Sequence, residues 1–129
     1  MLINLSNHTS KNWDAEQLAE AENNYGKVVD IPFPTISPTA TEDEIVALAK
    51  KYAQICISEL NKSDEAKEIA VHIMGEFTFV YAFIQLMQKE GVTCIASTTK
   101  RNVVNSSKGK IVKFKFVKFR KYSNLITIN

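Results

Sequence analysis

One stretch of the sequence, residues 68–101, constrains the fold more than any other because it reads as strand, turn, helix and strand. An apolar, β-branched run at 69–73 is broken at Gly75. Residues 77–89 then place apolar side chains three and four positions apart, as a helix does, and a second apolar strand follows at 93–96. A strand, helix and strand within about thirty residues is the parallel crossover unit, which is almost always right-handed.

Strands and helices alternate through the first part of the chain as well. Strands are predicted at residues 2–5 and 27–31. A first helix is expected from its N-cap Ser10 to about residue 23. The capping-box pattern of Thr41 and Glu44 predicts a second helix that runs to about residue 61, before a charged connector at 62–67.

The C-terminal part reads as a hairpin. Residues 102–104 and 110–120 are the two strands, with a turn at 106–109, and a shift in the apolar alternation at Val117 predicts a β-bulge. The whole pattern predicts an α/β fold: a doubly wound, mostly parallel, Rossmann-like sheet with a C-terminal antiparallel hairpin.

Length and composition indicate one globular domain. The chain has 129 residues, 45% of them hydrophobic. No run approaches the roughly twenty apolar residues of a membrane span, and no secretory signal is visible, so we expect a cytoplasmic protein without a membrane partner. Cys56 and Cys94 lie in apolar patterns and are expected to be buried free thiols, and no Cys/His spacing resembles a zinc site.

Charge is divided unevenly along the chain. Residues 91–129 hold nine Lys or Arg and no Asp or Glu, whereas residues 1–90 hold seven basic and fourteen acidic residues. This division favours an anionic partner for the C-terminal part, or it balances an acidic helical surface, and on this feature alone the two explanations weigh evenly.

Three polar segments, 6–10, 75–78 and 97–101, each follow a predicted strand. Because the carboxyl ends of parallel strands meet at one edge of a sheet, where open α/β sheets bind ligands, we expect the three segments to converge on one rim. Hydroxyls and cations at 97–101 suit phosphate oxygens, although a solvated turn is the alternative. The helix amides after Gly75 suit a phosphate or a base edge, but a tight turn with Glu76 complementing the helix dipole is the favoured interpretation.

Two histidines and one tryptophan stand out. His8 is placed in the first rim segment, where it serves as a general acid or base or, more commonly, as a loop organiser. His72 lies inside a strand and is expected to be a buried, hydrogen-bonded structural residue. Trp13 stacks on a base or, as the safer expectation, packs in the core.

Four short segments carry a resemblance to a known family. Asn4–His8, Asp30–Pro34, His72–Phe79 and Ala96–Arg101 resemble a family of small stand-alone CRISPR-associated proteins, which are similar to the CRISPR-associated Rossmann-fold (CARF) domains. The resemblance covers residues 1–122 as a single CARF-like domain and leaves 123–129 as a C-terminal tail.

The resemblance implies a function in antiviral defence. Such proteins bind cyclic oligoadenylate, the second messenger of type III CRISPR systems, in the cleft of a symmetric homodimer, with tetra-adenylate as the expected ring. Some relatives are ring nucleases, which cut the messenger. That reaction needs no metal or other cofactor, because a ribose 2′-hydroxyl attacks its own phosphorus in line, and positioning and charge stabilisation provide the rate.

The candidate residues come from the three rim segments. The candidate catalytic residues are His8, Ser97 and Thr98. The candidate ligand-binding residues are Ser6, Asn7, Gly75, Glu76, Thr78, Thr99, Lys100 and Arg101. Three alternatives stay open: a module that senses or sequesters the messenger without cutting it, an accessory protein that contacts RNA through the basic hairpin, and a structural subunit whose basic edge docks an acidic partner. No DNA partner is expected.

Overall fold

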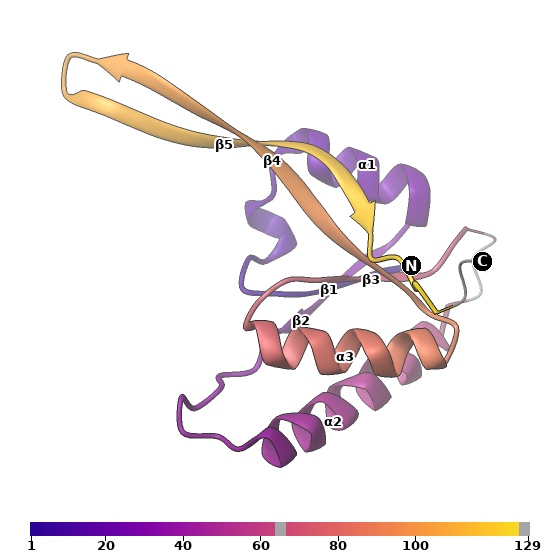
Figure 1. Cartoon of the computed structure of the whole chain (residues 1–129). Helices are drawn as coiled ribbons and strands as arrows, with labels where there is room; N and C mark the ends of the chain where they lie inside the picture. The colour runs from indigo at the N-terminus through magenta and orange to yellow at the C-terminus, as the bar shows by residue number, and fades with distance from the viewer. Residues whose placement is uncertain (64–66, 127–129) are drawn as a thin grey trace.

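A five-stranded sheet organises the part of the chain that the computed structural model describes, residues 1–63 and 67–126 (Figure 1). The strands are β1 (Leu2–Ser6), β2 (Val28–Pro32), β3 (Ala70–Ile73), β4 (Thr93–Ser106) and β5 (Gly109–Lys121). The helices are α1 (Ala15–Tyr25), α2 (Glu42–Leu60) and α3 (Phe77–Lys89), with a short 3-10 turn, η1 (Ser10–Asn12), ahead of α1.

The strand order is β2-β1-β3-β4-β5. The first four strands are parallel, and β5 pairs antiparallel with β4 at the edge of the sheet. This topology confirms the predicted Rossmann-like fold with its C-terminal hairpin. Because β1 leads to β2 on one side and β3 leads to β4 on the other, the order reverses between β1 and β3, and such a switch point leaves a crevice at the carboxyl ends of the strands.

Each face of the sheet has its own apolar core. Alternate residues of a strand point to opposite faces, so Leu2 packs with Ala21 and Tyr25 of α1, whereas Ile3 and Leu5 pack against α2 and α3. Figure 1 shows α1 on one side of the sheet and α2 with α3 on the other. The predicted buried thiols, Cys56 and Cys94, both belong to the core beneath α2 and α3, where burial raises the pKa of each to about 12. None of the described helices is long and apolar enough to cross a membrane.

The start of the second helix is confirmed and that of the first is corrected. Thr41 and Glu44 form the capping box that the sequence predicts. Ser10 is not the N-cap of α1: its hydroxyl donates to Asp30, 2.7 Å away, and η1 separates it from the helix. Asp14 is the N-cap instead, because its carboxylate accepts the backbone N–H of Gln17 at 2.9 Å.

The main correction concerns residues 97–101. They were expected to form a rim segment beyond the end of a strand, but they lie inside β4, where β5 supplies hydrogen-bonding partners as far as Ser106. The predicted bulge is confirmed, because the register shifts between Thr98 and Thr99, opposite Val117. Beyond the bulge the two strands leave the body of the molecule as a long ribbon (Figure 1). We call residues 100–115 the arm.

Two predicted segments lie partly outside the described residues. The charged connector at 62–67 includes residues 64–66, and the C-terminal tail at 123–129 includes residues 127–129. Tyr122, at the end of the predicted domain, is tied to the sheet because its hydroxyl donates to the carbonyl of Ile73 at 3.0 Å.

Candidate functional site

A cavity of about 590 Å³ lies at the switch point, between the start of α1, the ends of β1 and β3, and the base of the hairpin. Its walls combine hydroxyl, amide and imidazole groups with three aromatic rings. The lining residues are Ser6, Asn7, His8, Asn12, Trp13, Asp14, Gln17, His72, Met74, Gly75, Ser97, Thr99, Phe114 and Phe116. We call this cavity the switch-point pocket.

The structure brings together part of the predicted rim. Six of the candidate residues line the pocket: Ser6, Asn7, His8, Gly75, Ser97 and Thr99. Five do not: Glu76, Thr78, Thr98, Lys100 and Arg101. Ser97 and Thr99 point to the pocket side of β4, and residues 98 and 100 alternate to the other side. Ser97 also donates to the sulfur of Met74 at 3.2 Å, which links the ends of β3 and β4 at the pocket.

A polar network beneath the pocket fixes the loop that carries His8. The buried Asn4 side chain donates from Nδ2 to the His8 carbonyl and to Asp30, both at 2.8 Å. Ser6 Oγ donates to Asn4 Oδ1 at 2.8 Å and accepts the His8 backbone N–H at 3.3 Å. Burial raises the pKa of Asp30, but hydrogen bonds from Asn4 and Ser10 outweigh burial and leave the pKa below its usual value. The backbone of the loop is thus anchored while the His8 side chain stays exposed.

His72 is held in one tautomer. Its Nδ1 lies 2.9 Å from Asn4 Oδ1, and that oxygen is an acceptor because Asn4 Nδ2 is committed to its two donations. Nδ1 therefore carries the proton, and Nε2 is a buried acceptor without a hydrogen-bond partner. Burial lowers the pKa of His72 to about 4, so the ring stays neutral. The structural role predicted for His72 is confirmed, and its unpartnered Nε2 is a feature that the sequence does not reveal.

The turn at Gly75 has a packing role. A Cβ atom at this position would lie 2.3 Å from the ring of Phe33, so only glycine fits without movement of that ring. The Glu76 carboxylate caps α3 by accepting the N–H groups of Thr78 and Phe79, at 3.0 and 2.9 Å. The Thr78 hydroxyl and these amides lower the pKa of Glu76. Glu76 thus occupies those amides, as the favoured tight turn predicts, and the alternative role of the amides in binding a phosphate or a base edge stays a prediction.

Thr98 has a structural partner. Its hydroxyl donates to the carbonyl of Lys118 at 3.1 Å and accepts the Lys118 N–H at 3.2 Å, beside the bulge. Thr98 thus supports the hairpin rather than facing the pocket. Arg101 lies directly across from Phe114, on the pocket side of the arm, and Lys100 pairs with Lys115 on the opposite side.

The start of α1 and the hairpin complete the pocket, and the sequence does not identify this half. Trp13 meets His72 edge-on with ring centroids 5.3 Å apart, and it also packs against Phe119, whose ring lies beside that of Phe116. The alternation of aromatic residues along β5 indicates a shared face, but not the pocket that this face covers. The core packing expected for Trp13 is confirmed, and the same ring lines the pocket.

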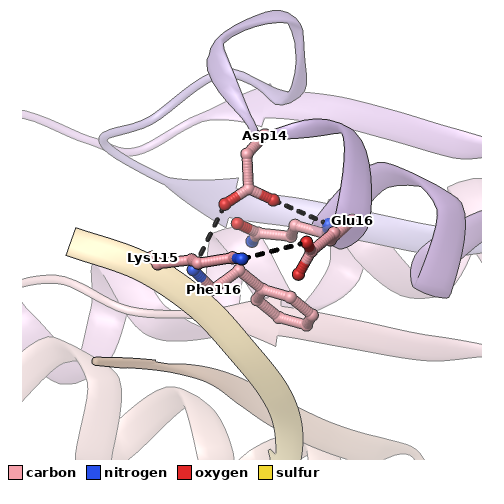
Figure 2. Close-up of polar contacts among 5 residues, drawn as sticks. Asp14, Glu16, Lys115 and Phe116 are labelled. Carbon is pink, nitrogen blue, oxygen red and sulfur yellow. Dashed lines mark hydrogen bonds and ion pairs between the residues drawn. The ribbon is translucent and has the colours of Figure 1, made fainter. Parts of the chain in front are cut away.

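Asp14 joins α1 to the hairpin (Figure 2). One carboxylate oxygen caps the helix, and the other accepts the backbone N–H of Phe116 at 3.2 Å. Beside it, Lys115 Nζ lies 3.3 Å from a carboxylate oxygen of Glu16. Asp14 and Phe116, which the longer of these two hydrogen bonds joins, both line the switch-point pocket. Within the described ranges, no cluster of three or more His, Cys, Asp or Glu side chains is arranged to hold a metal ion.

The fold and this pocket define a class: a Rossmann-like α/β protein with a polar and aromatic pocket at the switch point. A family model described as the uncharacterized protein MJ1673 family matches residues 1–120, and the chain belongs to that family. No curated protein matches the chain.

Proposed function

We propose that this protein is a CARF-like cytoplasmic protein of CRISPR antiviral defence that binds cyclic oligoadenylate. The observation that carries the proposal is the composition of the switch-point pocket. Hydroxyls and amides of Ser6, Asn7, Ser97 and Thr99 suit ribose and phosphate oxygens, and the Trp13 ring offers a stacking surface for a base. The position of the pocket at the carboxyl ends of parallel strands agrees with a nucleotide ligand.

The symmetry of the ligand sets the assembly. A cyclic tetra-adenylate presents equivalent halves, and a two-fold homodimer offers equivalent pockets to them. Each pocket would hold part of the ring, with its ribose near Ser97 and Thr99. The pocket's hydroxyls can also orient a 2′-hydroxyl toward its neighbouring phosphorus.

Cleavage would follow from that orientation. The 2′-hydroxyl attacks the adjacent phosphorus, the bond to the 5′-oxygen breaks, and a cyclic 2′,3′-phosphate and a free 5′-hydroxyl result. Ser97 and Thr99 position the ribose, and His8 either accepts the attacking proton or donates one to the leaving oxygen. No cofactor takes part in this scheme.

A binding protein that does not cut the messenger is the second candidate. Three titratable side chains line the pocket, His8, Asp14 and His72. Asp14 is committed to two backbone N–H groups and His72 is buried, which leaves His8 for proton transfer. A pocket with so little acid–base chemistry also suits a sensor or a sequestering module.

Product analysis separates the two candidates. The pure protein is incubated with cyclic tetra-adenylate in EDTA, and the products are resolved. Linear products ending in a cyclic phosphate support the ring nuclease, and tight binding with an intact ring supports the sensor. Absence of binding to any cyclic oligoadenylate contradicts the proposal, and selective binding of linear RNA favours the RNA-binding alternative.

Single-turnover rates test the roles of the pocket residues. If positioning dominates, Ser97→Ala should slow cleavage strongly and His8→Ala mildly; if His8 is the acid or base, its loss should cost roughly a hundredfold or more with little change in affinity. Ser58→Ala, an exposed serine on α2, is the matched control. Thr98→Ala should act mainly on hairpin stability, and a cleavage defect as large as that of Ser97→Ala would contradict the geometry.

A further inference from the structure

The arm carries apolar surface that the rest of the chain does not cover. Val103 pairs with Val112 and Val104 pairs with Ile111 across the two strands. The exposed fractions of these four side chains are 51%, 41%, 48% and 44%. Because neighbouring residues of a strand point to opposite faces, the two pairs place aliphatic surface on both faces of the arm. A two-stranded ribbon is marginal by itself in water, and clustered exposed apolar side chains mark interaction sites.

Charge distinguishes the arm from the body of the molecule. The arm holds six of the nine basic residues that follow residue 90, and it has no acidic residue. Helix α1 holds Glu16, Glu20 and Glu22 and has no Lys or Arg. All three glutamates are exposed. One contact between these surfaces already exists within the chain, between Lys115 and Glu16 at 3.3 Å (Figure 2).

We propose that the arm docks on a second copy of this chain, where its aliphatic pairs are buried and its lysines meet the acidic surface of the partner's α1. The base of each arm lies beside its own α1, held there by Asp14 and Glu16. A two-fold axis near this junction lets each arm cross the other copy's α1, so both contacts form together and the assembly closes as a dimer.

Two other occupants fit the arm less well. Nucleic acid would meet its cations, but bases stack on aromatic rings, and the tip offers only aliphatic pairs. The one aromatic residue of the arm, Phe114, lies near its base, where it lines the switch-point pocket. Edge-to-edge pairing of two arms would place many lysines of β5 side by side, and lysines on an edge strand oppose such pairing. This arm-docked dimer names the surfaces that would form the homodimer of the proposed function. The docking proposal itself does not depend on any ligand.

The first test is the oligomeric state without ligand, measured by sedimentation over a range of concentrations. The wild type should be a dimer. Val103→Thr with Val112→Thr keeps β-branched residues in the ribbon but should raise the dissociation constant about tenfold or more. Val46→Thr, a comparably exposed valine on α2, is the matched control and should leave the dimer unchanged.

A charge-exchange experiment tests the docking surface even if the arm variant folds poorly. Glu20→Lys with Glu22→Lys should weaken the dimer, as should Lys110→Glu with Lys113→Glu. The chain that combines all four changes should dimerise again.

A mixture of the two double variants should also form a dimer. In a mixture of the two double variants, one contact sets a lysine arm against a glutamate helix and the other sets a glutamate arm against a lysine helix. Both contacts are attractive, whereas each double variant alone has two repulsive contacts. The mixture and the fourfold variant should therefore both restore the dimer.

Several results would overturn the docking proposal. One is a wild type that stays monomeric at every concentration. Another is a dimer whose dissociation constant is the same in the valine and the charge variants as in the wild type. A third is a set of arm variants that lose only oligonucleotide binding. A monomer that still cuts cyclic tetra-adenylate would refute the docking of the arm and the proposed homodimer, but it would leave the proposed ligand and reaction standing. A dimer that binds no cyclic oligoadenylate would do the reverse.

Discussion

At the scale of single residues, His72 shows how burial fixes the protonation state of a side chain. Asn4 fixes its tautomer, and the edge-on rings of Trp13 and Phe119 enclose it. A charged imidazole would lose its hydration in these surroundings, so the folded protein holds the neutral form.

Stability should therefore depend on pH through His72. Folding lowers the pKa of His72 from 6.5 to about 4. Between these two pH values the unfolded chain binds a proton on His72 and the folded chain does not. The contribution of neutral His72 to the free energy of unfolding is complete above pH 6.5 and is lost as the pH falls toward 4. We expect the free energy of unfolding in urea to drop by about 2 kcal/mol between pH 7 and pH 5.

Two histidine variants test whether His72 causes this drop in the free energy of unfolding. His72→Gln removes the titrating group and should flatten the profile between pH 7 and pH 5. His8→Gln, at the exposed histidine, should keep the wild-type profile. A profile unchanged by His72→Gln would contradict the assignment. Asp30, with its lowered pKa, should contribute a further loss only below its usual value of 3.8.

Gly75 gives a second prediction at this scale. Gly75→Ala should destabilise the fold by about 1–3 kcal/mol, because the added Cβ meets the Phe33 ring, which packs edge-on against Phe79. In a Phe33→Leu background the same change should cost less. Equal costs in the two backgrounds, measured by urea unfolding, would show that the contact with Phe33 is not the reason for glycine.

At the scale of elements, the junction of α1 and β5 depends on Asp14. Asp14→Ala loses both the helix cap and the bond to Phe116, whereas Asp14→Ser can still cap the helix. We expect Asp14→Ala to cost more stability than Asp14→Ser, and both variants to speed hydrogen exchange at the Phe116 amide. Thr41→Ala, which removes only a cap on α2, should cost about 1 kcal/mol and leave that amide protected.

At the scale of the whole molecule, the basic C-terminal part lies beside the pocket. Arg101 is on the pocket side of the arm and Lys100 is on the other side. Arg101→Ala should weaken binding of cyclic tetra-adenylate and lower the slope of log affinity against log salt by about 1. Lys100→Ala is the matched control with a small effect, and equal losses would contradict the assignment of faces.

Local signals in the sequence determined the elements of this protein. The apolar periods predict the strands and helices, Thr41 and Glu44 predict a capping box, and the shift at Val117 predicts the bulge, because each feature depends on residues close together in the chain. The order of these elements was enough to predict a Rossmann-like sheet with an antiparallel hairpin.

Only the tertiary structure decided how the site is assembled. Residues 97–101 are polar enough to read as a loop, but pairing with β5 makes them a strand. Asp14 bonds to Phe116 across 102 positions of sequence, and His72 bonds to Asn4 across 68. Such contacts leave no local pattern, because they arise from the packing of distant segments. The sequence therefore predicts the rim at β1, while the wall formed by Trp13, Phe114 and Phe116 follows from the fold.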